Sequence, residues 1–133
     1  MRVTVVGCSG SFAGPESPAS SYLVQQEAGG RTWNLLLDLG SGALGALQRH
    51  LPPDDLDAVV LSHLHPDHCV DLCGLYVTRR YRPGGATPGH LPVHGPTGTA
   101  ERVAMMYQGL EPGAMEAPFT FHVVADAVPL TVG

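Results

Sequence analysis

Short apolar stretches alternate with turns rich in glycine and proline along the whole chain. Stretches with β-branched or alternating apolar side chains predict strands, which fall at residues 3–6, 21–26, 32–37, 58–61, 91–94 and 119–124. Apolar positions at helical spacing predict helices, which fall at residues 43–50, 70–81 and 97–108. Residues 7–19, 83–89 and 111–118 are expected to form loops.

The order of these elements predicts the class of fold. Gly29 and Gly30 predict a hairpin turn between the second and third strands. After this hairpin, strands alternate with helices, which is typical of parallel βα units. We therefore expect an α/β or α+β fold with a mixed sheet, and Thr97 is the expected N-cap of the last helix. A length of 133 residues fits one small domain.

The strongest chemical signal lies at residues 63–68, which read His-Leu-His-Pro-Asp-His and follow the apolar run 58–61 directly. Imidazole nitrogens and carboxylate oxygens are the ligands of zinc and similar divalent metals. Side chains that follow a strand lie at the rim of a sheet, where open α/β folds tend to build their sites. The sequence therefore predicts a metal site at the end of the fourth strand.

The spacing within this motif predicts two metal positions. His63 and His65 project to the same side of an extended backbone, so both could reach one metal. Asp67 and His68 follow a proline that turns the chain, and they are expected to reach a second metal. Two metals that share a hydroxide make a strong nucleophile. Asp67 is also the catalytic candidate, because a carboxylate there can hold the attacking water.

A structural explanation of the motif is a histidine-rich loop at the start of a helix, with Asp67 as N-cap. We favour the metal site, because a motif gains weight from its context and this one follows a buried strand.

The motif, residues 35–42 and residues 71–75 together resemble the metallo-β-lactamase superfamily, in its ribonuclease Z and phosphodiesterase-like branch. The resemblance implies the N-terminal αβ half of an αββα sandwich, with a mixed sheet and helices on one face. It implies Zn²⁺ as the cofactor, two ions in a complete domain, with Mn²⁺ or Fe possible. The implied metal ligands are His63, His65, Asp67 and His68. It also implies that Asp38 orients the histidines from behind; the alternative is a turn-forming aspartate.

The chain resembles only the first half of such a domain. In the family a third histidine, a bridging aspartate and a last histidine come from the second half, and nothing after Val123 offers that set. We therefore expect residues 1–133 to be a single, incomplete domain with one uncovered sheet face. A bare apolar face predicts that the chain self-associates as a homo-oligomer, needs a second chain or is poorly stable.

Charge and cysteine content narrow the partners and the compartment. The net charge is −5, and an acidic chain without a basic stripe is a poor candidate for broad nucleic-acid binding. The arginines at 79, 80 and 82 could bind a phosphate or could form a solvated helix end, and we favour the helix end.

Three cysteines form no disulfide framework, and no apolar run reaches the length of a signal peptide or a membrane span. We expect a cytoplasmic protein with no membrane association.

These observations favour a metal-dependent hydrolase of phosphodiester or related ester bonds, which uses a metal-activated hydroxide on a small-molecule or nucleotide-type substrate. The sequence assigns no substrate-binding residue. Two alternatives stay open. The first is an inactive metal-binding or self-assembling fragment, and the second is a thiolesterase of the glyoxalase type.

Overall fold

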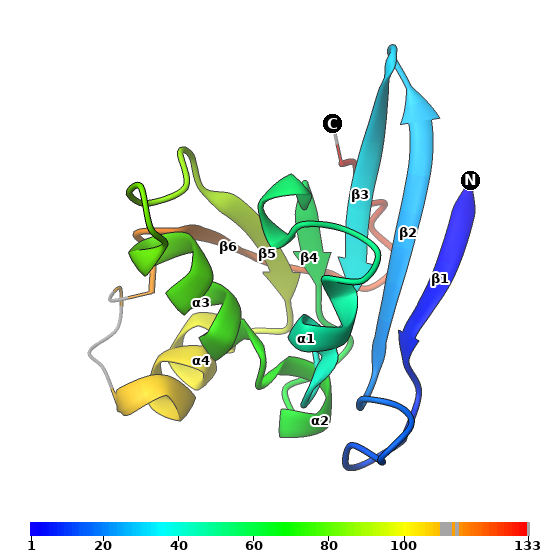
Figure 1. Ribbon diagram of the computed structural model, residues 1–133. Coiled ribbons are helices and arrows are strands. Elements are labelled where there is room, and N and C mark those ends of the chain that lie inside the picture. Colours follow the sequence, from blue (N-terminus) through cyan, green and yellow to red (C-terminus); the bar gives the residue numbers. More distant parts are fainter. Residues whose placement is uncertain (110–112, 114, 133) are drawn as a thin grey trace.

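The computed structural model describes residues 1–109, 113 and 115–132. Within these residues, six strands form one sheet in the order of the sequence (Figure 1). They are β1 (Arg2–Gly7), β2 (Ser21–Ala28), β3 (Arg31–Leu37), β4 (Ala58–Val60), β5 (Leu91–Gly95) and β6 (Phe119–Val123). Strands β1 to β3 pair antiparallel, and β3 to β6 pair parallel. The predicted mixed sheet is confirmed.

The helices pack on one face of this sheet (Figure 1). They are α1 (Ala43–Leu47), the 3₁₀ turn η1 (Pro53–Asp55), α2 (Pro66–Cys69), α3 (Leu72–Tyr81) and α4 (Thr99–Gln108). The sheet side chains beneath them are buried, because successive residues of a strand point to opposite faces and one face meets the helices. These side chains include Leu23, Leu36, Val59, Val93 and Phe119. No helix of the described residues has the length and apolar content needed to span a membrane.

Three predicted helix boundaries are wrong. Helix α1 ends at Leu47, earlier than predicted. The segment 70–81 begins its helix at Leu72, because a separate short helix, α2, starts inside the metal motif with Pro66 in its first turn. Thr97 does not cap α4: the N-cap is Gly98, in a left-handed conformation. Of the predicted loop 111–118, residues 111, 112 and 114 lie outside the described residues.

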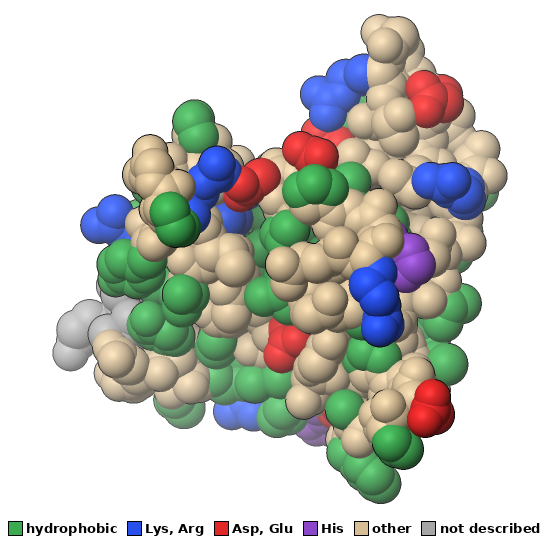
Figure 2. Space-filling model, viewed as in Figure 1, with side chains coloured by type: hydrophobic (Ala, Val, Ile, Leu, Met, Phe, Trp, Pro, Cys, Tyr) green, Lys and Arg blue, Asp and Glu red, His purple; other side chains and the backbone are tan. Residues whose placement is uncertain are grey.

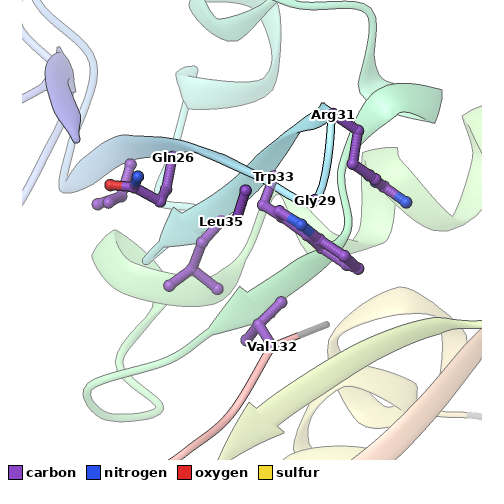
Figure 3. Close-up of a pocket in the computed structure, with 8 residues that line it drawn as sticks. Gln26, Gly29, Arg31, Trp33, Leu35 and Val132 are labelled. Carbon is purple, nitrogen blue, oxygen red and sulfur yellow. The ribbon is translucent and has the colours of Figure 1, made fainter.

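The opposite face of the sheet is only partly covered. Val3 and Val5 are each 58% exposed, and their partner strand β2 turns Val24 to the same side. Near the hairpin of β2 and β3 this face holds a pocket of about 370 Å³, lined in part by Trp33 and Leu35. Val132, from the C-terminal segment, lies at the rim of the pocket (Figure 3). The chain therefore lays its own C-terminal segment across part of the exposed face.

Candidate metal centre

The metal motif lies at the carboxyl end of β4, where the sequence predicts it (Figure 1). His65 has an extended backbone and is the N-cap of α2, and Pro66 fixes the first helical position. His63 and His65 therefore stand on a loop, whereas Asp67 and His68 stand on the first turn of a helix. Because the backbone changes from extended to helical within the motif, the side chains of His63, Asp67 and His68 can approach one another although they are close in sequence.

Three of the four predicted ligands come together. One ligand atom each of His63, Asp67 and His68 lies within 4.8 Å of the other two. His68 Nε2 is 3.2 Å from Asp67 Oδ2, and the rings of His63 and His68 have centroids 3.8 Å apart. His65 is exposed, and its ring lies 4.9 Å from the ring of His63. His63 thus lies closer to His68 than to His65, whereas the spacing argument pairs it with His65.

Asp38 stands directly behind this cluster. Its side chain is buried, and the residue is 6% exposed. Oδ2 lies 2.7 Å from Nδ1 of His68 and also accepts a hydrogen bond from the Ser20 hydroxyl at 3.1 Å. The backbone N–H of Ser62 donates to Oδ1 at 2.8 Å. The hydrogen bond to Asp38 therefore fixes the orientation of the His68 ring.

The turn after Asp38 packs against the backbone of the motif. Leu39 N–H donates to the carbonyl of His68 at 2.7 Å, and Ser20 N–H donates to the carbonyl of Asp67 at 3.1 Å. A Cβ on Gly40 would lie 1.9 Å from the Asp67 carbonyl oxygen, so only glycine permits this approach. Two loops distant in sequence therefore hold the start of α2 in place.

Two further contacts brace the motif and were not predicted. Arg102, on α4, donates from Nε to the carbonyl of Leu64 at 3.3 Å. Cys69 is buried on α2 and donates from Sγ to the carbonyl of His65 at 3.2 Å. Burial raises the pKa of the Cys69 thiol to about 11, so the residue stays a thiol and packs as a small apolar side chain. The sequence could not predict these two contacts, because each is a single hydrogen bond to a backbone carbonyl and no motif or residue spacing indicates it.

The arginine cluster lies away from the centre. Helix α3 begins next to α2 and its last turn is about 15 Å further along the axis, at the opposite end of the sheet (Figure 1). The expectation of a solvated cluster is wrong for Arg79, which is only 4% exposed, and Arg82 pairs with Asp54. On the face seen in Figure 2, basic side chains are scattered and do not gather into a stripe.

The remaining strand histidines form a separate pair. His94 and His122 are register partners on β5 and β6, and their rings stack with centroids 4.8 Å apart. Burial and the neighbouring His122 lower the pKa of His94. Neither belongs to the cluster of ligand atoms found among the described residues.

Comparison with known proteins decides the family. The sequence model described as "Metallo-beta-lactamase superfamily" matches residues 14–126. The chain belongs to this superfamily. An uncharacterized protein of Mycobacterium tuberculosis, Rv1339, is 46% identical over 100% of the chain and 48% of its own length. A ribonuclease Z of Mycolicibacterium paratuberculosis is 36% identical, over 83% of the chain and 38% of its own length.

A solved metallo-beta-lactamase fold protein supports the same assignment. The crystal structure of YhfI from Bacillus subtilis superimposes with a TM-score of 0.74 at 30% identity, covering 98% of this chain and 49% of that one. The chain thus spans about half the length of the relatives that it matches along its whole length. The predicted superfamily and its ribonuclease Z-like branch are confirmed.

Proposed function

We propose that the chain carries the metal-binding half of a hydrolase of phosphodiester or related ester bonds. The observation that carries this proposal is the cluster of His63, Asp67 and His68 at the end of β4, with Asp38 behind His68. Relatives named as a ribonuclease Z and a probable metallo-hydrolase support the class of reaction. A small-molecule or nucleotide-type phosphodiester is the substrate that we propose.

The donor set fits a borderline divalent metal. Two imidazoles and one carboxylate are a common ligand set of catalytic zinc, with Mn²⁺ or Fe as alternatives. Bound there, such an ion would supply Lewis-acid activation of a water and of a phosphoryl oxygen. In our proposal His63, His68 and Asp67 hold the metal, and His65 is the fourth ligand that we propose. Asp67 also accepts the proton of the attacking water.

A complete dinuclear site needs ligands beyond this cluster. The described residues offer one group of three ligands, whereas two metals need more. We propose that the remaining ligands come from a second chain or from polypeptide outside the described residues, and that self-association covers the exposed sheet face. Three cysteines without a disulfide fit a reducing compartment, and we propose a cytoplasmic location.

The test is hydrolysis of bis-p-nitrophenyl phosphate in the presence of Zn²⁺ or Mn²⁺. We expect metal-dependent turnover that is lost in the variant His63→Ala, His65→Ala. Turnover of a glutathione thioester in its place would favour the glyoxalase-type alternative. Tight metal binding without turnover of either substrate would mean an inactive metal-binding fragment.

A further inference from the structure

Ser62 lies between β4 and the first histidine of the motif, and both its polar groups are engaged. Its backbone N–H donates to Asp38 Oδ1 at 2.8 Å, and its hydroxyl donates to Asp38 Oδ2 at 2.9 Å. The same hydroxyl oxygen lies 3.1 Å from Nδ1 of His63. Ser62 therefore connects the buried carboxylate to an imidazole that Asp38 does not itself contact by a hydrogen bond in the described residues.

The direction of these hydrogen bonds follows from the number of available protons. An ionised carboxylate only accepts, so the single hydroxyl proton of Ser62 points to Asp38. The hydroxyl oxygen is then left as the acceptor for His63, which must carry its hydrogen on Nδ1. This leaves the Nε2 lone pair of His63 free for a metal.

His68 contacts Asp38 directly, and its Nδ1 also lies 3.4 Å from the Ser62 hydroxyl oxygen. Its Nδ1 lies 2.7 Å from Asp38 Oδ2 and must donate to it. Its Nε2, 3.2 Å from Asp67 Oδ2, is therefore the nitrogen with the free lone pair. Both imidazoles thus keep the lone pair of Nε2 free for a metal.

We propose that Ser62 is a positioning residue that fixes the tautomer of His63 and ties it to Asp38, so that one carboxylate orients two metal-binding imidazoles. Asp38 acts on His68 directly and on His63 through the Ser62 hydroxyl. This assignment rests on the proposed metal-dependent function only in that it takes His63 and His68 as ligands. The tautomer itself is a property of the metal-free chain.

The chain offers a matched control. Ser20 donates its hydroxyl to the same Oδ2 of Asp38, at 3.1 Å, but makes no hydrogen bond to an imidazole within the described residues. Ser20→Ala therefore removes a donor from Asp38 and leaves His63 untouched. Ser62→Thr keeps the hydroxyl at an exposed position. Ser62→Ala removes the hydroxyl alone.

The first experiment is histidine tautomer assignment by NMR on the metal-free, ¹⁵N-labelled chain at about pH 8, where an ordinary imidazole is neutral. We expect His63 in the Nδ1–H form in the wild type, in Ser20→Ala and in Ser62→Thr. Ser62→Ala is expected to lose this preference. A wild-type His63 in the Nε2–H form, or a Ser62→Ala spectrum unchanged from the wild type, overturns the proposal.

The second experiment is Zn²⁺ affinity by competition with a chromophoric chelator, with thermal unfolding of each metal-free variant as the folding control. Loss of an outer hydrogen-bond partner typically weakens metal binding 10- to 100-fold, so we expect Ser62→Ala to bind about tenfold more weakly. Ser62→Thr and Ser20→Ala are expected near the wild type. Equal affinity of Ser62→Ala and the wild type overturns the proposal. If the tautomer and affinity results hold but no ester is hydrolysed, the proposed hydrolase fails and the role of Ser62 stands.

Discussion

Asp38 combines a strained backbone with a buried carboxylate. Its φ of 58° lies in the left-handed region, which costs a non-glycine residue on the order of 1–3 kcal/mol. The surroundings hold this conformation in place, since Ser62 and His68 both bond to the carboxylate. In this conformation the carboxylate contacts Ser62 and also His68 of the metal motif.

For single residues, the sequence predicts which side chains belong to the candidate site better than it predicts the contacts between them. The residue types and their position after a strand predict that His63, Asp67 and His68 form a cluster, and the structure brings one ligand atom of each within 4.8 Å of the others. Ser62 could not be recognised, because a single hydroxyl between two polar partners has no spacing signal. The interpretation of Arg79 and Arg80 as one solvated helix end fails for Arg79, because this residue lies on the buried face of α3 that also carries Leu72, Leu75 and Tyr76.

Arg79 supplies a stability prediction. Its Nε and Nη1 have no hydrogen-bond partner among the described residues, and burial lowers its pKa. Replacing a poorly compensated buried charge by an apolar side chain is often neutral or stabilising, so Arg79→Met should leave the free energy of unfolding unchanged or raise it by about 1 kcal/mol. Urea denaturation measures this, with the exposed Arg80→Met as control. A loss of about 2 kcal/mol or more would mean that the guanidinium is well paired.

The elements around the centre are short, and this limited their prediction. The strands were recognised because β-branched and alternating apolar residues persist over most of their length. Helix α2 was not, because Pro66–Cys69 is too short to show a helical period. The contact between α2 and the turn at Gly40 depends on a close approach of Gly40 to the backbone of Asp67. A pattern of hydrophobic residues does not predict such an approach.

Gly40 tests this junction. Because a Cβ at this position would lie 1.9 Å from the Asp67 carbonyl oxygen, Gly40→Ala must displace the start of α2. We expect a loss of about 1–3 kcal/mol in the free energy of unfolding, as for an overpacked core, together with weaker Zn²⁺ binding. The matched control is Gly45→Ala in α1, where a Cβ meets nothing within 4 Å and a small gain is expected. Equal free energies of unfolding and equal Zn²⁺ affinities of the two variants would contradict the close approach of Gly40 to Asp67.

The stacked pair of His94 and His122 predicts a pH dependence of stability. Because burial and His122 lower the pKa of folded His94, the unfolded chain binds more protons than the folded chain at pH values below the ordinary imidazole pKa of about 6.5. The contribution of His94 to stability is therefore present above that value and is lost as the pH falls through the folded pKa. Urea denaturation at several pH values should show a smaller loss in His94→Gln than in the wild type. Parallel curves would contradict this account.

At the scale of the whole molecule, the sheet is covered by helices on one face and is partly exposed on the other. The sequence predicted this only through the family resemblance, because the apolar side chains of β2 and β3 do not reveal what covers them. The position of Val132 at the pocket on this face was not predicted, since the C-terminal segment has no periodic pattern. The relatives that match the full chain are about twice its length.

The exposed face predicts self-association. Leu35 lines the pocket on this face, so Leu35→Glu should shift the chain toward monomer by placing a charge in an apolar contact. Val77, 41% exposed on the helical side, provides the control Val77→Glu, which should leave the association state unchanged. Analytical ultracentrifugation over a range of concentrations measures both. A wild-type chain that stays monomeric throughout would show that the face needs no second copy.

The most direct test of the metal-binding half is zinc content per chain, measured by elemental analysis after loading with Zn²⁺ and exhaustive dialysis. The comparison is between the wild type and the variant His63→Ala, His68→Ala. With three ligands gathered in the described residues, we predict that the wild type retains about one zinc and that the variant retains none. A wild type that retains no zinc, or a variant that retains as much as the wild type, would contradict a metal centre at this motif.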